Sequence, residues 1–364
     1  MYTYRKKKRN TKNTLISTRK SHTINNNALP ESISRPKIHL FSFNSSNVHE
    51  KTIDVDEISS ALKDHSQHIW INVHGIHDTD LINKIGIAFN LHPLVIDDIL
   101  NTEQRPKVDD FDAYIFLETR FFYYETNTMS VNSEQISMVL GNRFLLTFQE
   151  KPSGAFESIR ERLRTTHTSM RDLGVDYLAY SLLDSIVDRY FSVLDEMNNA
   201  SETLESKLLN NPSPIELNQI HQLKRASIEL RRSVWPLREV INHLIRNENG
   251  FFHTTTIPYL RDVHDHIVSF IESLESIRDN LSGLMDIYMT SVSNRVNLEL
   301  RALTVVAMLF MPATLIAGIF GMNFVHMPWI EHVNGFWWAI GIMGAIAVVM
   351  LLIFWRRQWL TSQN

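Results

Sequence analysis

Two long apolar runs lie close together near the C-terminal end of the chain. Residues 302–324 hold 23 consecutive positions without a charge, and residues 335–355 hold 21 more. At about 1.5 Å per residue, each run forms a helix long enough to cross the roughly 30 Å hydrocarbon core of a membrane. Aromatic residues at the run ends, and Arg301 and Arg356 outside them, are typical of membrane helices with cytoplasmic outer ends. The pattern predicts two transmembrane helices rather than the alternative, a buried hairpin in a soluble core.

The sequence before the first apolar run has the pattern of one very long helix. Between Pro258 and Pro312 there is no other proline and a single glycine, Gly283. Proline is favoured in the first turn of a helix, so we expect a stalk helix over 257–322 whose last part, about 302–322, is the first membrane segment. A helix of that length is stable only when it packs on other helices or on copies of itself.

One face of this predicted helix combines polar and large apolar side chains. Asp286, Asn297, Leu300 and Met311 are separated by 11, 3 and 11 residues, and 11 residues make about three helical turns. The stripe suggests a hydrated vestibule followed by a hydrophobic constriction; an ordinary coiled-coil seam is the alternative. Two membrane helices cannot enclose a water-filled path alone, so a pore requires several copies around an axis.

The remaining segments divide the chain further. Short β-rich runs alternate with helical ones in residues 37–160, which predicts an α/β domain. Residues 161–256 hold two helical stretches, 175–211 and 215–234, separated by the breaker NNPSP, which predicts a helical hairpin. After the long helix we expect an extracytoplasmic loop at 323–334, the second membrane helix at 335–355, and a basic cytoplasmic end at 356–364.

Charge is distributed unevenly along the chain. Residues 1–36 hold nine lysines and arginines against one acid, Glu31, so the remaining residues carry 27 basic and 39 acidic side chains, a formal charge of −12. We interpret the first segment as a disordered basic arm that contacts anionic lipid, with a transit peptide as the alternative. An acidic body disfavours nucleic acid as a partner and is compatible with divalent cations.

Motifs for catalysis are missing from the sequence, which predicts that the protein is not an enzyme. There is no cysteine, phosphate-binding glycine loop, nucleophile elbow or HExxH motif. Histidine pairs such as His264 and His266 are as easily explained as surface residues. Paired carboxylates are more informative: Asp97 and Asp98 lie in one helical run, and Asp262 lies near the start of the long helix. Carboxylates from two elements suit Mg²⁺, although solvated acids on a helix face are the simpler alternative.

Several motifs together resemble the CorA family of magnesium transporters. They are HQLKR at 221–225, WPLRE at 235–239, IPYLRDVHDH at 257–266 and FMPATLIAGIFGMNF at 310–324. The Gly-Met-Asn tripeptide after the first of two C-terminal membrane helices is the family's signature. The resemblance covers the chain from about residue 37 to its end and leaves the basic arm without a counterpart.

The resemblance implies a fold class and a function. The family forms homopentameric, funnel-shaped channels, each subunit with an α/β cytoplasmic domain, a long all-α stalk and two transmembrane helices. We therefore expect a multi-pass protein of the cell (inner) membrane with both termini in the cytoplasm. Its expected function is Mg²⁺ influx driven by the membrane potential, with Co²⁺ and Ni²⁺ as further candidate ions, gated by intracellular Mg²⁺ that binds between subunits.

The resemblance also assigns site residues. The implied selectivity filter is Gly321, Met322 and Asn323. The implied pore and gate residues are Asp286, Asn297, Leu300, Leu303 and Met311. The implied regulatory Mg²⁺ ligands are Asp98 and Asp262, with Asp97 beside them. Two alternatives remain: a zinc or other transition-metal transporter of the related ZntB type, and a non-conducting, membrane-tethered Mg²⁺ sensor.

Overall fold

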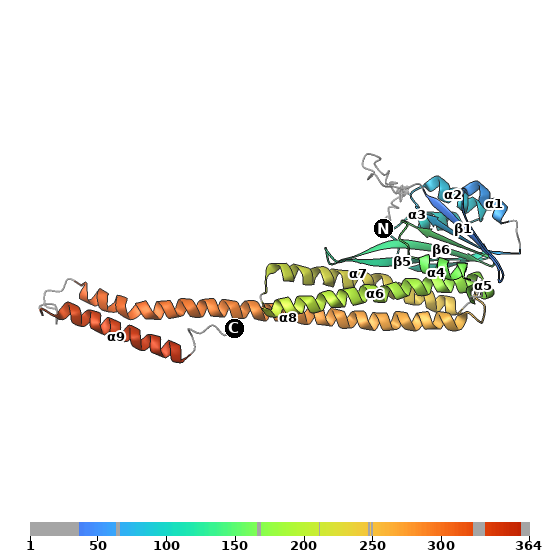
Figure 1. The fold of residues 1–364 in the computed structure, drawn as a ribbon. Coiled ribbons are helices and arrows are strands. Elements are labelled where there is room, and N and C mark those ends of the chain that lie inside the picture. Colours follow the sequence, from blue (N-terminus) through green and yellow to red (C-terminus); the bar gives the residue numbers. More distant parts are fainter. Residues whose placement is uncertain are drawn as a thin grey trace, which may run out of the picture. The chain divides into compact units, whose positions relative to one another are not determined.

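A computed structural model of the chain describes residues 36–62, 66–165, 169–210, 212–246, 248, 250–322 and 332–357. Nearly all of the basic arm, most of the predicted extracytoplasmic loop and most of the C-terminal end therefore lie outside the described residues. The α/β domain, the long helix and the two apolar helices that the sequence predicts are all present (Figure 1).

A seven-stranded sheet forms the first folded part, in the order β2-β1-β3-β7-β6-β5-β4. All neighbouring strands are antiparallel except β3 and β7, which run parallel. The strands are β1 (Lys37–Phe43), β2 (Val48–Ile53), β3 (His68–His74), β4 (Lys107–Phe111), β5 (Tyr114–Glu125), β6 (Ser130–Gly141) and β7 (Phe144–Gln149).

Both faces of the sheet are covered, which explains the near-continuous apolar character of its central strands. Along β3, Ile69 and Ile71 face one hydrophobic core and Trp70, between them, faces the other. The core that contains Ile69 and Ile71 is covered by four short helices on one side of the sheet (Figure 1). They are η1 (Val55–Glu57), α1 (Ile58–Ala61), α2 (Thr79–Ala88) and α3 (Pro93–Leu100).

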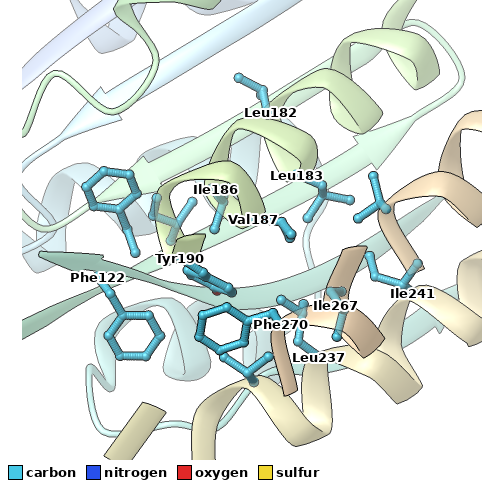
Figure 2. Close-up of a cluster of buried hydrophobic side chains, with 14 of the residues drawn as sticks. Phe122, Leu182, Leu183, Ile186, Val187, Tyr190, Leu237, Ile241, Ile267 and Phe270 are labelled. Carbon is cyan, nitrogen blue, oxygen red and sulfur yellow. The ribbon is translucent and has the colours of Figure 1, made fainter. Parts of the chain in front are cut away.

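Longer helices cover the opposite face. They are preceded by α4 (Glu157–Arg164) and α5 (Ser169–Leu173) and comprise α6 (Val175–Asn210), α7 (Pro214–Arg246) and the first half of α8 (Ile257–Phe320). Figure 2 shows where they meet: Phe122 of β5, Tyr190 of α6, Leu237 of α7 and Phe270 of α8 point into one buried cluster. The 64-residue α8 is therefore anchored to the sheet domain through α6 and α7.

The helix α7 is longer than the sequence pattern predicted. Its start is capped by side chains: Ser213 Oγ accepts a hydrogen bond from the Ile215 amide, and Glu216 Oε2 accepts one from the Ser213 amide. It does not end at Val234 but continues through Pro236 to Arg246. The residues after the proline that pack into the core are Leu237, Val240, Ile241 and Leu244. Their burial outweighs the backbone hydrogen bond that a proline removes.

Candidate ion pathway and metal sites

Two of the described helices, α8 and α9 (Gly335–Arg356), are long and apolar enough to cross a membrane. Only 6% of the most apolar stretch in each helix is buried within the chain. A core helix of a soluble protein would be mostly buried, so the exposed apolar surfaces of α8 and α9 are those of membrane helices.

The contact between α8 and α9 leaves one face of α8 open. The two helices lie beside each other (Figure 1), and the side chains that are buried there include Val305, Ala339 and Phe354. Leu300, Leu303 and Met311 are all more than half exposed. Successive residues are 100° apart around a helix, so these three lie on a different side of α8 from Val305. Asp286 and Asn297 are also exposed, nearer the sheet domain.

A shallow groove of about 660 Å³ follows the membrane part of this open face. Its lining residues are Ala307, Phe310, Met311, Thr314, Leu315, Gly318, Ile319 and Met322. The hydroxyl groups beside it are satisfied by the helix itself, because Thr304 donates to the Leu300 carbonyl at 2.8 Å and Thr314 donates to the Phe310 carbonyl at 2.9 Å. The open face of α8 is therefore mostly apolar, and its threonine hydroxyl groups are already hydrogen-bonded within the helix.

The predicted filter begins where α8 ends. Gly321 follows the last helical residue, and its amide donates to the Ala317 carbonyl at 2.9 Å. The Met322 amide donates to the Ile319 carbonyl at 3.2 Å, and the Met322 side chain is half exposed. Asn323 lies outside the described residues. Two of the three predicted filter residues are thus at the end of the open face.

Asp98 occupies the last turn of α3, which is fixed to the sheet. His92 caps the start of this helix, with Nδ1 accepting a hydrogen bond from the Leu94 amide, and Pro93 is its first residue. At the other end, the buried Gln135 of β6 donates from Nε2 to the Asp98 carbonyl at 3.0 Å. The neighbouring Asp97 is exposed. The position of the Asp98 carboxylate is consequently well defined.

Both oxygens of the Asp98 carboxylate have partners within the chain. Gln104 Nε2 donates to Oδ1 at 2.8 Å, and Lys107 Nζ lies 2.5 Å from Oδ2. The same ammonium lies 3.2 Å from Asp109 Oδ2. Burial lowers the pKa of Lys107, but the hydrogen bonds to Asp98 and Asp109 outweigh that effect and raise it above its ordinary value. Lys107 is therefore a charged partner of the carboxylate.

A second acid lies beneath this ion pair. Glu118 of β5 is directly opposite Lys107 of β4 in the antiparallel ladder and is only 1% exposed. Neither of its carboxyl oxygens has a hydrogen-bond partner among the described residues. Burial raises the pKa of Glu118 to about 8, and the positive charge of Lys107 opposes part of that rise. Such a carboxyl favours its neutral form at pH 7 unless a cation approaches it.

Asp262 lies on the first turns of α8, with its side chain 64% exposed. His266, one turn later, has its Nε2 3.9 Å from Asp262 Oδ2. Within one chain, α3 with Asp98 lies on one face of the sheet, whereas α8 with Asp262 packs on the helices that cover the other face. The structure of one chain therefore does not bring the two predicted regulatory ligands together.

A third group of candidate ligands lies next to Asp262, and the sequence analysis missed it. One potential ligand atom each from Asp184, Asp188 and His266 lies within 4.8 Å of the others. The first two are one turn apart on α6, and the histidine comes from α8. Burial raises the pKa of Asp184, and the charges of Asp188 and Asp262 raise it further, while His266 opposes the shift. Asp262 is therefore electrostatically part of this cluster.

The donor atoms at these positions fit a hard divalent cation. Carboxylate oxygens are the side-chain ligands that Mg²⁺ prefers, and Mg²⁺ keeps several waters, so few protein ligands suffice. An imidazole nitrogen such as that of His266 suits Co²⁺ and Ni²⁺ better. A cation near Asp184, Asp188 and Asp262 would also relieve the repulsion between these carboxylates.

Comparisons with known proteins agree with the geometry. The family model described as CorA-like Mg²⁺ transporter protein matches residues 65–357. The cobalt/magnesium transport protein CorA of Thermotoga maritima is 42% identical over 310 residues, covering 85% of this chain and 88% of that protein. The complete structure of the CorA magnesium transporter from Methanocaldococcus jannaschii matches with a TM-score of 0.75 at 20% identity, covering 88% of this chain and 98% of the other.

The cytoplasmic domain of ZntB from Vibrio parahaemolyticus shares the fold as well. It matches with a TM-score of 0.56 at 16% identity, covering 71% of this chain and 98% of that domain. At such low identity the likeness concerns the fold alone, so the fold does not separate a CorA-type protein from a ZntB-type protein. The sequence relationship to the Thermotoga protein does favour magnesium and cobalt.

Proposed function

The chain belongs to the CorA-like Mg²⁺ transporter family, whose members are membrane proteins that transport metal ions and are not enzymes, and we propose that it forms a homopentameric channel for Mg²⁺ influx. The observation that carries this proposal is the open face of α8. Leu300, Leu303 and Met311 remain exposed although α9 packs on another side of the same helix. Several copies of this face around an axis would enclose a path lined by one helix per subunit.

Along this path each set of side chains has a distinct function. Asp286 and Asn297 form polar rings at the cytoplasmic end, where the charge of Asp286 concentrates cations. Leu300, Leu303 and Met311 form the hydrophobic gate, which blocks ions when it is dry. Gly321, Met322 and Asn323 form the filter at the outer mouth. The amide oxygens of an Asn323 ring suit a Mg²⁺ ion that keeps its hydration shell, because neutral acceptors bind its water molecules without removing them.

The driving force is the membrane potential, negative inside. A divalent cation gains about 4.6 kcal/mol per 100 mV when it enters, twice the value for a single charge. The orientation that the flanking arginines favour puts the sheet domain in the cytoplasm, so that domain is exposed to the ion after entry.

Regulation follows from the acid sites. Mg²⁺ held between Asp98 of one subunit and Asp262 of the next, with Asp97 nearby, keeps neighbouring subunits together and the pore closed. Asp184, Asp188 and His266 extend this site on the α8 side. Loss of the ion leaves several carboxylates in mutual repulsion, and the subunits separate enough for the hydrophobic gate to fill with water.

Flux into proteoliposomes tests the proposal. Mg²⁺ entry at negative internal potential should occur at low cytoplasmic-side Mg²⁺ and be suppressed at high Mg²⁺. Asp98→Ala and Asp262→Ala should relieve the suppression, whereas Asp279→Ala, an exposed acid farther along α8, should not. Asn323→Ala should abolish flux while the protein still responds to Mg²⁺. No flux from correctly inserted pentamers would favour the sensor instead, and Zn²⁺ flux without Mg²⁺ flux would favour the ZntB-like alternative.

A further inference from the structure

Asp98 already has a cationic partner within its own chain. Lys107 Nζ lies 2.5 Å from Asp98 Oδ2, while Gln104 occupies the other oxygen. The Asp98 side chain is 16% exposed and that of Lys107 is 31% exposed, so solvent weakens this ion pair only in part. A metal ion that approaches Asp98 therefore meets a carboxylate whose charge is already compensated. For Mg²⁺ to bind there with full strength, the ammonium group has to leave.

A second position for the ammonium group exists next to the first. Glu118 pairs with Lys107 across the β4–β5 ladder, so both side chains project from the same face of the sheet. The carboxyl group of Glu118 is buried and lacks a hydrogen-bond partner among the residues that the structure describes. Lys107 also lies over the Phe116 ring, 5.6 Å from its centroid, on the side of the sheet that carries Glu118. A rotation about the lysine's side-chain bonds is enough to bring the ammonium group from Asp98 toward Glu118.

We propose that Lys107 is a built-in cation that competes with Mg²⁺ for Asp98 and that Glu118 receives the lysine when the ion binds. The inference rests on the proposed regulatory function of Asp98 and explains how the affinity of that site is set. A competing ammonium group raises the Mg²⁺ concentration that is needed to close the pore.

Glu118 favours the movement of Lys107 away from Asp98. A buried acid without a partner destabilises the folded chain, and the arrival of Lys107 removes that penalty. The new interaction between Lys107 and Glu118 therefore offsets part of the free energy that is lost when Lys107 leaves Asp98. Without the carboxylate at position 118, Lys107 would lose its alternative partner and would compete with Mg²⁺ more strongly.

Mg²⁺-dependent thermal stability of the full-length protein in detergent tests this without measuring transport. The half-saturating Mg²⁺ concentration is read from the rise in melting temperature as Mg²⁺ is added. Lys107→Met should lower it about tenfold, because the competitor is removed. Lys107→Arg, which keeps the positive charge, should leave it at or above the wild-type value. Lys84→Met removes an exposed lysine from α2 and should leave it unchanged.

Two further variants complete the test. Glu118→Gln should raise the half-saturating concentration about threefold, and adding it to Lys107→Met should have no further effect, since Glu118 acts only through the lysine. An unchanged or higher Mg²⁺ requirement in Lys107→Met overturns the proposal. Asp98→Ala distinguishes a failure of the Lys107 proposal from a failure of the proposed regulatory site at Asp98. If it loses the Mg²⁺ response, the regulatory site stands whatever Lys107 does; if it responds like wild type, the proposed function of Asp98 fails.

Discussion

The hydroxyl group of Tyr190 donates a hydrogen bond to the backbone carbonyl oxygen of Arg120, with 2.5 Å between the two oxygens. The tyrosine is on α6 and the arginine is on β5, so this bond joins the helical hairpin to the sheet. The Tyr190 ring is 1% exposed and packs against Phe122 of the sheet and Phe270 of α8 (Figure 2). One side chain therefore contacts the sheet, the hairpin and the long helix.

Removing this hydroxyl group should destabilise the cytoplasmic part. Tyr190→Phe keeps the ring and leaves a buried carbonyl oxygen without this donor, which costs roughly 1–2 kcal/mol. Tyr124→Phe, on β5 with Arg120, is the matched control, because the Tyr124 hydroxyl is buried without a hydrogen-bond partner among the described residues. Thermal unfolding should show a melting temperature that is lower by a few degrees for Tyr190→Phe and unchanged or raised for Tyr124→Phe. Equal changes in melting temperature for the two variants would mean that the Tyr190 ring, and not its hydrogen bond, contributes to stability.

Glu134 gives the stability a specific pH dependence. Burial raises its pKa from an ordinary 4.5 to about 7, although hydrogen bonding from Ser153 opposes the shift. The folded chain therefore holds this proton more tightly than the unfolded chain, so the stability contributed by Glu134 falls as pH rises from about 4.5 to about 7. Glu134→Gln should gain stability relative to wild type over that interval, reaching about 2–3 kcal/mol above pH 7.

Denaturant unfolding at pH 5 and pH 8 measures this difference. Glu229→Gln, an exposed acid on α7, provides the control for loss of a carboxylate and should track wild type at both values. A gain from Glu134→Gln that is the same at pH 5 and pH 8 would contradict an origin in the titration of Glu134.

The hydrophobic gate is testable by comparing two faces of α8. Met311→Ala, on the open face, should widen the constriction and allow about tenfold more Mg²⁺ flux at suppressing Mg²⁺ concentrations. Leu309 is half-buried and points away from Leu300, Leu303 and Met311 around the helix, so Leu309→Ala should keep the pore closed. Proteoliposome flux at high cytoplasmic-side Mg²⁺ measures both. Similar leaks from the two variants would indicate general loosening of the helix rather than a gate.

The cluster beside Asp262 predicts a contribution to Mg²⁺ binding. Asp184→Asn keeps the side-chain shape but removes one carboxylate and one strong ligand, so the half-saturating Mg²⁺ concentration should rise by about three- to tenfold. Asp195→Asn changes an exposed acid three turns farther along α6 and should have no such effect. Mg²⁺-dependent melting temperature is again the measurement. A wild-type response from Asp184→Asn would exclude Asp184 as a ligand.

Periodic and compositional signals predicted the large elements. More than fifty residues with no proline and a single glycine predicted α8, and uninterrupted apolar runs predicted both membrane helices. The strand β5 was also visible, because aromatic and β-branched residues fill it. The strands β2 and β4 were missed because their sequences, VHEKTI and KVDDF, are mostly polar and lie at the two edges of the sheet. Polar edge strands carry little of the apolar signal that identifies central ones.

The proposed site residues could be identified from the sequence only where a local motif marked them. Asp98 and Asp262 stood in motifs, but Lys107 became relevant only through its pairing with Glu118 across two strands. The partnership between Asp184 and His266 depends on how α6 packs against α8, more than eighty residues later in the chain. Acids one turn apart on a helix were the available signal for that cluster, and such pairs are too common to identify a site without the fold.

The helix α8 runs without interruption from Ile257 to Phe320, and this continuity makes it a stiff lever. At about 1.5 Å per residue, roughly 70 Å separates its first residue from Leu303. A tilt of about 5° at the end held by the sheet domain displaces the level of Leu303 by about 6 Å, since displacement grows in proportion to helix length. In the proposed channel, angular changes too small to disturb the packing of α6, α7 and α8 would therefore produce a large change in the pore radius at Leu303.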